Sequence, residues 1–254
     1  MCRHLAWVGE PRTLASLVLE REHSLLHQSF APRHQTHGVV NADGFGVGWY
    51  VPSRAEPVRY RRAQPIWSDA SFASLAPTIS SGCLLAAVRD ATPGFAASDE
   101  SSAAPFLHDR WLFSHTGALT DWPGARRRLL SRGLAVPEAA APVDSALLFG
   151  VAVAAFTAGA SLADGLADTI AAAEAVGGGR LSFLATDGEH LAATSYGDPL
   201  FCHESATGVI LASEPLDEHP GWRRLPSHSL VHGGRDGIHT RPLPPPPDAI
   251  KETQ

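Results

Sequence analysis

Cysteine is the second residue of the chain, and its position suggests covalent chemistry. An initiator methionine before a small residue is normally removed, which would leave Cys2 with a free α-amine. Such an amine has a pKa of about 7.7–8.0 in unstructured peptides, so part of it can accept the thiol proton near pH 7. The thiolate is a strong nucleophile, so one residue supplies both nucleophile and base. A small residue at a chain end is the alternative explanation, and Cys2 alone does not decide between them.

Two charged side chains lie at the predicted ends of elements, where they could bind the charged groups of an amino acid. Arg89 ends an apolar run over residues 83–89, and a guanidinium there can bind a carboxylate through two parallel hydrogen bonds. Asp144 follows Pro142 at the predicted start of a helix, where the helix dipole favours an ionised carboxylate. Taken singly, Arg89 is equally compatible with a side chain that extends to solvent, and Asp144 is more typical of a helix N-cap.

Residues 114–117, Ser-His-Thr-Gly, end a predicted strand in a glycine turn. A strand that ends in this way can leave backbone N–H groups unpaired and directed at one point, as an oxyanion hole requires. An ordinary strand-to-turn junction is the alternative, and it is the more common meaning of this pattern alone.

Six short segments, in this order and spacing, resemble the class II glutamine amidotransferases, the cysteine-type members of the N-terminal-nucleophile hydrolases. The segments are Met-Cys-Arg-His at 1–4, Asn-Ala-Asp-Gly-Phe-Gly at 41–46, Val-Arg-Asp-Ala-Thr at 88–92, Ser-His-Thr-Gly at 114–117, Val-Asp-Ser at 143–145 and Ala-Ser-Glu-Pro-Leu at 212–216. The resemblance implies that Cys2 attacks a γ-glutamyl amide, that Arg89 binds the α-carboxylate of the substrate, and that Asp144 binds its α-ammonium.

The same resemblance implies an oxyanion hole formed by Thr116 and Gly117. It also places further substrate-binding residues at Ala91, Thr92 and His115. The family usually has Asn at the position of Thr116. The threonine hydroxyl reaches less far than an Asn amide nitrogen, so we expect Thr116 to be a secondary donor beside the backbone N–H of Gly117.

Within the family, residues 1–9, 69–77 and 211–217 are most similar to the amidohydrolases of ergothioneine biosynthesis, which hydrolyse γ-glutamyl-hercynylcysteine sulfoxide. This resemblance implies a hydrolase that acts on a small-molecule γ-glutamyl conjugate without a cofactor, a metal or an obligatory protein partner. Two alternatives stay open: a glutaminase subunit that passes ammonia to a partner synthase, and an inactive family member that serves as a binding module. After the matching segments about 40 residues remain, fewer than the roughly 100 that a synthase domain needs, which favours the hydrolase.

The predicted secondary structure elements that position these residues follow an order of strands first, helices in the middle and strands again at the end. Helical spacing predicts short helices at 12–20 and 69–75, and two Ala-rich segments at 143–157 and 161–175 predict longer helices that pack on a sheet. Strands are predicted at 2–8, 45–51, 83–89, 111–115, 180–186, 190–195, 200–203 and 209–213, with weaker ones near 229 and 239. This order predicts an α+β fold with mostly antiparallel strands. The resemblance implies the four-layer αββα sandwich of the N-terminal-nucleophile hydrolases.

Composition limits the domain organisation and the partners. The chain has 254 residues, is 44% hydrophobic and carries a formal net charge of −6, so it has no overall attraction to nucleic acid or anionic membranes. It has no apolar run of about 18 residues and no signal-peptide pattern, so a cytoplasmic location is the default expectation. We expect one domain over residues 2–241 and a Pro-rich, disordered or extended tail over 242–254.

The remaining cysteines and tryptophans carry weaker expectations. The three cysteines are widely spaced, which argues against a disulfide framework or a zinc site, and Cys83 is expected to be an inert core residue. Of the six tryptophans, Trp7 and Trp49 are the candidates for lining the substrate pocket.

Overall fold

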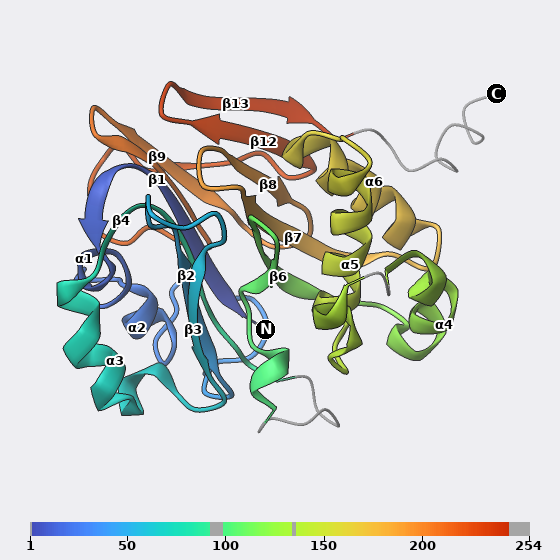
Figure 1. The fold of residues 1–254 in the computed structure, drawn as a ribbon, viewed down its shortest axis with the longest axis horizontal. Helices are drawn as coiled ribbons and strands as arrows, with labels where there is room; N and C mark the ends of the chain where they lie inside the picture. The colour runs from blue at the N-terminus through green and yellow to red at the C-terminus, as the bar shows by residue number, and fades with distance from the viewer. Residues whose placement is uncertain (1, 92–98, 134–135, 244–254) are drawn as a thin grey trace.

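Two antiparallel β-sheets lie face to face in the computed structural model of the chain, with helices on the outer face of each sheet (Figure 1). The structure describes residues 2–91, 99–133 and 136–243. Every strand pairing in these residues is antiparallel. The predicted α+β class and the four-layer αββα sandwich are therefore confirmed.

The first sheet has seven strands in the order β11-β9-β10-β1-β4-β2-β3. Its members are β1 (Arg3–Thr13), β2 (Phe45–Trp49), β3 (Val58–Arg62), β4 (Ser80–Val88), β9 (Phe201–Ser205), β10 (Gly208–Ala212) and β11 (Arg223–Arg224). The second sheet has six strands in the order β13-β12-β8-β7-β6-β5. Its members are β5 (Phe106–His108), β6 (Trp111–Leu119), β7 (Gly179–Thr186), β8 (Leu191–Ser195), β12 (Ser229–Gly234) and β13 (Gly237–Pro242).

Within the described residues, three helices cover each outer face (Figure 1). Those on the seven-stranded sheet are α1 (Leu14–Val18), α2 (Leu25–Gln28) and α3 (Ala70–Leu75). Those on the six-stranded sheet are α4 (Trp122–Gly133), α5 (Asp144–Thr157) and α6 (Leu162–Glu174). Short 3₁₀ helices occur at Ile66–Ser68, Ala76–Thr78, Glu100–Ser102 and Pro137–Ala140. No helix in the described ranges combines the length and the apolar character that crossing a membrane would require.

The four layers enclose three hydrophobic cores, and β1 shows how one strand serves two of them. Leu5 and Trp7 pack under α1–α3, while Ala6 and Val8 point into the core between the sheets. Successive side chains of a strand point to opposite faces, so a strand that is covered on both sides needs apolar residues at both alternations. This explains the continuous apolar run at the start of the sequence.

The first strand was predicted to end at residue 8, before Gly9, and this expectation is wrong. β1 continues to Thr13, with an irregularity in its pairing between Val8 and Arg12. A Cβ at Gly9 would lie 2.2 Å from the carbonyl oxygen of Thr207. The glycine therefore permits a close approach of β1 and the β9–β10 turn rather than a break in the strand.

The two Ala-rich segments form α5 and α6 within a residue of their predicted ends, and Thr13 is the N-cap residue of α1. The helix α4 was not predicted from the sequence. β13 ends at Pro242, one residue beyond the expected limit of the domain. The predicted tail lies mostly outside the described residues, so its expected disorder stays a prediction.

Candidate active site

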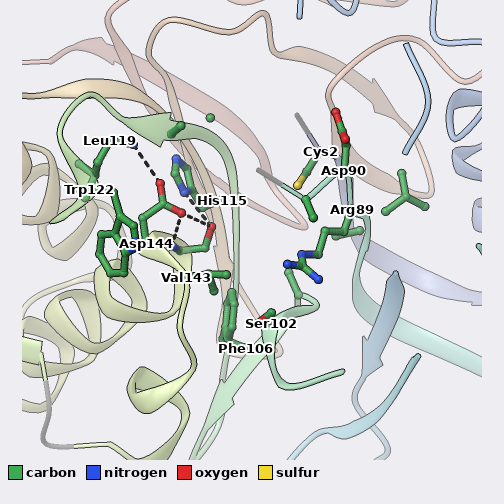
Figure 2. Close-up of a pocket in the computed structure, with 17 residues that line it drawn as sticks. Cys2, Arg89, Asp90, Ser102, Phe106, His115, Leu119, Trp122, Val143 and Asp144 are labelled. Atoms are coloured by element: carbon green, nitrogen blue, oxygen red, sulfur yellow. Dashed lines mark hydrogen bonds between the residues drawn. The ribbon is translucent and has the colours of Figure 1, made fainter. Parts of the chain in front are cut away.

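A pocket at the start of β1 and the end of β4 gathers residues from both sheets and from α5 (Figure 2). Of the eight site residues expected from the sequence, six line this pocket: Cys2, Arg89, Ala91, His115, Gly117 and Asp144. Thr116 lies next to two of them in β6, and Thr92 lies outside the described residues. Residues separated by up to 142 positions in the sequence, Cys2 and Asp144, thus meet at one place.

The ladder between β1 and β4 explains why Cys2 and Arg89 meet. Arg3 pairs with Val88, so the same register places Cys2 opposite Arg89. Opposite residues of an antiparallel pair project from the same face, with Cβ atoms about 4.5–5.5 Å apart. Figure 2 shows both side chains at the same wall of the pocket. The strand pairing alone therefore brings the expected nucleophile next to the expected carboxylate-binding residue.

The loop before β2 holds the Arg89–Ala91 segment in place. Asp43 exchanges two hydrogen bonds with Arg89: the Asp43 N–H donates to the Arg89 carbonyl at 2.9 Å, and the Arg89 guanidinium donates to the Asp43 carbonyl at 3.4 Å. The carboxylate of Asp43 accepts the N–H of Ala91 at 2.8 Å. The Asn-Ala-Asp-Gly motif thus supports Arg89, which is 6% exposed, rather than facing the substrate itself.

Asp144 is the first residue of α5, and Val143 is the N-cap residue. The carboxylate of Asp144 accepts the N–H of Ser145 at 2.8 Å and the N–H of Leu119, in β6, at 2.9 Å. These two donors fix the direction of the carboxylate, which lies in the first turn of α5. Figure 2 shows Asp144 on the side of the pocket opposite Arg89.

Gly117 was expected to end a strand in a turn, and this expectation is wrong. β6 continues to Leu119, and Gly117 pairs with Leu181 of β7. On the other side of β6, β5 pairs only as far as Phe113, so the edge of β6 beyond this residue is not covered by a strand in the described part of the chain. The unpaired N–H groups therefore arise from a short neighbouring strand and not from a turn.

The alternation of the β6–β7 ladder gives the direction of the Gly117 N–H. The N–H of Leu119 points away from β7 and donates to Asp144. Antiparallel N–H groups alternate with a period of two, so the N–H of Gly117 lies on the same open edge, facing the pocket. Its φ of +142° and a Cβ that would lie 1.9 Å from the Arg180 carbonyl oxygen explain why glycine occupies this position.

Thr116 projects from the other face of β6, into the space between the sheets. Ser114 on that face bonds His4 of β1, Oγ to Nδ1, at 3.0 Å. Cys2 lies two residues before His4, and Thr116 lies two residues after Ser114. Both are therefore on the pocket side of this bonded pair. The Thr116 hydroxyl is buried and has no hydrogen-bond partner among the described residues. A buried hydroxyl without a partner costs about 1–3 kcal/mol, and the expected role of Thr116 as an oxyanion donor stays a prediction.

Replacing Thr116 with valine tests how much the hydroxyl contributes, because valine keeps the shape and removes the donor. Loss of an oxyanion donor typically lowers the rate by about 10² to 10³-fold. We expect a smaller loss in kcat/KM, since the N–H of Gly117 remains. A loss within the full range would identify the hydroxyl as the principal donor and reverse this ranking.

His115 lines the pocket with a ring whose two nitrogens both have protein partners. Nε2 donates to the carbonyl oxygen of Arg180 at 2.9 Å, because a carbonyl can only accept. In the neutral ring Nδ1 then accepts the hydroxyl of Ser145 at 3.0 Å. His115 therefore fixes Ser145 beside Asp144, a link that its position in the sequence did not reveal, and its direct contact with substrate stays a prediction.

The expectation that Trp7 and Trp49 line the substrate pocket is wrong. Both are buried in the core under α1–α3, because the alternation of β1 and β2 directs them to the outer face of their sheet. The aromatic residues of the pocket are Phe106 and Trp122 instead. Trp122 belongs to α4, which sequence periodicity did not predict.

The described residues contain no group of three or more His, Cys, Asp or Glu side chains placed to bind a metal ion. The ring of His34 packs against that of Phe201, with 4.9 Å between the ring centroids. Its backbone N–H donates to Glu214 at 3.0 Å. His34 therefore has a structural role, through ring packing and a backbone hydrogen bond.

A comparison with known families supports what the fold and the pocket indicate. Residues 14–203 match the family described as class II glutamine amidotransferases. The chain belongs to this family.

Two hydrolases are similar to this chain over nearly its whole length, and a third relative is similar over about half of it. The γ-glutamyl-hercynylcysteine sulfoxide hydrolase of Mycolicibacterium smegmatis is 45% identical over 234 residues, which cover 91% of this chain and 95% of the relative. The enzyme of the same name from Mycobacterium tuberculosis H37Rv is 42% identical over 239 residues, covering 94% and 95%. A probable glutamine amidotransferase of Saccharomyces cerevisiae is 32% identical over 52% of this chain and 38% of the relative.

Solved structures confirm the fold. A glutamine aminotransferase class-II domain protein from Silicibacter pomeroyi superposes with a TM-score of 0.69 at 24% identity, covering 96% of this chain and all of the other. The glutamine phosphoribosylpyrophosphate amidotransferase of Bacillus subtilis gives a TM-score of 0.69 at 15% identity over 96% of this chain and 49% of the other.

Proposed function

We propose that this protein hydrolyses the γ-glutamyl amide of γ-glutamyl-hercynylcysteine sulfoxide and releases glutamate and hercynylcysteine sulfoxide. The observation that carries the proposal is the 45% identity to a hydrolase of that name over nearly the full length of both chains. The pocket supports it independently, because a sulfur nucleophile, a buried guanidinium and a carboxylate line one cavity. The comparisons favour neither the ammonia-supplying subunit nor the inactive binding module.

The reaction follows from the placement of these groups. Arg89 binds the α-carboxylate and Asp144 the α-ammonium of the γ-glutamyl unit, which sets the γ-carbonyl at Cys2. The α-amine of processed Cys2 takes the thiol proton, and Sγ attacks the γ-carbon. The N–H of Gly117, assisted by Thr116, stabilises the oxyanion. Removal of Met1 is required for this step, and Met1 lies outside the described residues.

The oxyanion then collapses and the amide C–N bond breaks, while the Cys2 ammonium gives its proton to the departing amine. The glutamyl group stays on Cys2 as a thioester. The regenerated α-amine activates a water molecule, which attacks the thioester through a second oxyanion at Gly117. Glutamate leaves and the thiol is restored, so the chain's own residues carry each proton transfer.

The leaving amine of the proposed substrate is larger than ammonia and carries a trimethylammonium group, so a second part of the pocket has to accept it. Asp90 lines the pocket beside Cys2. Consecutive side chains of an extended segment diverge, and Figure 2 shows the Asp90 carboxylate directed away from the Arg89 guanidinium. Besides Asp144, which is assigned to the α-ammonium, Asp90 is the other acidic side chain that lines the pocket, and its negative charge would attract a cationic leaving group.

The substrate assignment is tested by kcat/KM for the sulfoxide conjugate against glutamine, with purified protein and no partner. We expect a preference of about 10²-fold or more for the conjugate, because contacts to the leaving group are made in the transition state. Equal or better use of glutamine would instead favour the glutaminase subunit.

Asp90→Asn is the matched variant, since it removes the charge and keeps the shape. We expect it to lower kcat/KM for the conjugate about tenfold and to leave kcat/KM for glutamine within about twofold. An equal loss for both substrates would assign Asp90 to the support of Arg89 rather than to the leaving group.

A further inference from the structure

Arg3 directly follows the proposed nucleophile, and its side chain is completely buried. It is 0% exposed and heads the set of largest fully buried side chains in the described chain. An arginine in such a place is costly unless its charge is compensated and its N–H groups are bonded. A buried guanidinium next to Cys2 therefore needs an explanation that the mechanism above does not provide.

One contact joins Arg3 to the nucleophile itself. The Nε–H of Arg3 donates to the carbonyl oxygen of Cys2 at 2.9 Å. In the processed protein Cys2 is the first residue, so no preceding peptide group restrains it. The ends of chains fray unless they are tied down, and the Cys2 carbonyl is the part of its backbone that this bond fixes.

Glu214 lies opposite Arg3 across the ladder between β1 and β10. Leu5 pairs with Ala212, and the ladder continues because the Ser213 N–H donates to the His4 carbonyl at 2.9 Å. The next pair in this register is Arg3 with Glu214. Cβ atoms of such a pair are about 4.5–5.5 Å apart, within reach of two long side chains of opposite charge.

Glu214 is itself buried and tied to a loop. It is 1% exposed, and its Oε2 accepts the backbone N–H of Arg33 at 2.6 Å and that of His34 at 3.0 Å. The carboxylate therefore holds the loop after α2 against the start of β1. Burial lowers the pKa of Arg3, and the charges of Glu214 and Asp198 oppose this effect, so the acidic groups keep the guanidinium ionised.

We propose that Arg3, whose charge faces that of Glu214 across the β1–β10 ladder, is a positioning residue that fixes the backbone of the nucleophile Cys2. This inference rests on the proposed function only in taking Cys2 as the nucleophile. A reacting atom displaced by about 1 Å can lose 10²-fold in rate, so a terminal nucleophile needs such an anchor. The pair acts on the alignment of the thiol with the substrate and not on substrate affinity, which belongs to Arg89 and Asp144.

The test compares two covalent reagents with different demands on alignment. A diazoketone analogue of glutamine reacts only when Cys2 is aligned with the bound glutamyl unit, whereas iodoacetamide reacts with the thiol in any orientation. Arg3→Lys keeps a charge and loses the Nε–H bond, and Glu214→Gln keeps an acceptor oxygen and loses the charge. Arg12→Lys is the matched control, because Arg12 also lies in β1 and bonds Thr207, not Cys2.

We expect Arg3→Lys to slow inactivation by the diazoketone and to lower kcat for γ-glutamyl hydrolysis, each by about 10- to 100-fold. The KM and the rate of alkylation by iodoacetamide at a given pH should stay within about threefold, and Arg12→Lys should change none of these. The double variant with Glu214→Gln should lose less than the product of the single losses, because the two residues act as one unit.

Three outcomes would overturn the proposal. Unchanged diazoketone inactivation in a folded Arg3→Lys protein would show that the bond does not align Cys2. An equal slowing of both reagents would show that Arg3 alters the reactivity of the thiol instead. If neither Arg3→Lys nor Glu214→Gln folded, the pair would belong to the fold alone. The inactivation assay needs no knowledge of the natural substrate, so failure of the proposed function would appear separately as poor turnover of the conjugate.

Discussion

Replacement of Cys2 by alanine is expected to abolish hydrolysis of both the conjugate and glutamine while the protein stays folded. Loss of the nucleophile removes the thioester route and leaves only binding and oxyanion stabilisation, so kcat should fall by roughly 10⁴- to 10⁶-fold. Cys2 precedes β1, and its bond to Arg3 uses the backbone carbonyl, which alanine retains. The thermal midpoint should therefore change little.

Alkylation offers an independent measurement of the same thiol. Cys83 and Cys202 are both buried, and burial raises the pKa of their thiols to about 12 and about 11. At pH 7.5 these two groups are almost entirely protonated and shielded, whereas Cys2 is partly exposed. Iodoacetamide should add once to the wild-type chain, with complete loss of activity, and not to the folded Cys2→Ala variant.

Intact mass of the active protein should lack Met1, because the mechanism needs the α-amine of Cys2. An active enzyme that quantitatively retains Met1 would contradict the role of the amine. A Cys2→Ala variant with near-normal turnover would end the assignment of the nucleophile.

The second large effect is expected at the two residues that bind the charges of the glutamyl unit. Arg89→Lys replaces a bidentate fork with a point charge, and Asp144→Asn removes the partner of the substrate ammonium. Each should cost about 2–5 kcal/mol in kcat/KM, which corresponds to a loss of about 30-fold to several thousand-fold. Asn at position 144 also places an amide near the N–H groups of Ser145 and Leu119, so the thermal midpoint must be compared in parallel.

Substrate analogues separate charge recognition from structural damage. A glutaryl amide lacks the α-ammonium, and a 4-aminobutyryl amide lacks the α-carboxylate. Asp144→Asn should have little further effect on the first analogue, and Arg89→Lys little further effect on the second, since the lost partner is absent in each case. Equal losses on complete and truncated substrates would show that the variants act through the fold.

Local patterns were sufficient where one strand or helix decides the outcome. The apolar run before Arg89 predicted a buried strand, and β4 ends one residue before the guanidinium that lines the pocket. The Ala-rich segments predicted α5 and α6 because a helix face repeats along a single stretch of sequence. The six sequence segments also indicated the family, because their order and spacing can be seen in the sequence without a structure.

Patterns failed where a residue's role depends on a distant neighbour. Gly9 and Gly117 were both expected to lie beyond the ends of strands, yet each lies within a strand that a second backbone approaches too closely for a side chain. Trp7 and Trp49 read as pocket residues, although the alternation of a sheet covered on both faces directs them into a different core. Such facts depend on strand order, which local periodicity does not contain.

The sequence by itself determined which chemical groups are present: a cysteine placed to gain a free amine, an arginine after a buried strand and an aspartate at a helix start. Only the tertiary structure decided how they meet. The β1–β4 register sets Cys2 opposite Arg89, and the short β5 leaves the edge of β6 open for the N–H of Gly117. The reason is physical: a pocket between two sheets is formed by pairings between residues far apart in the chain, and these are selected by the packing of the whole core rather than by any one segment.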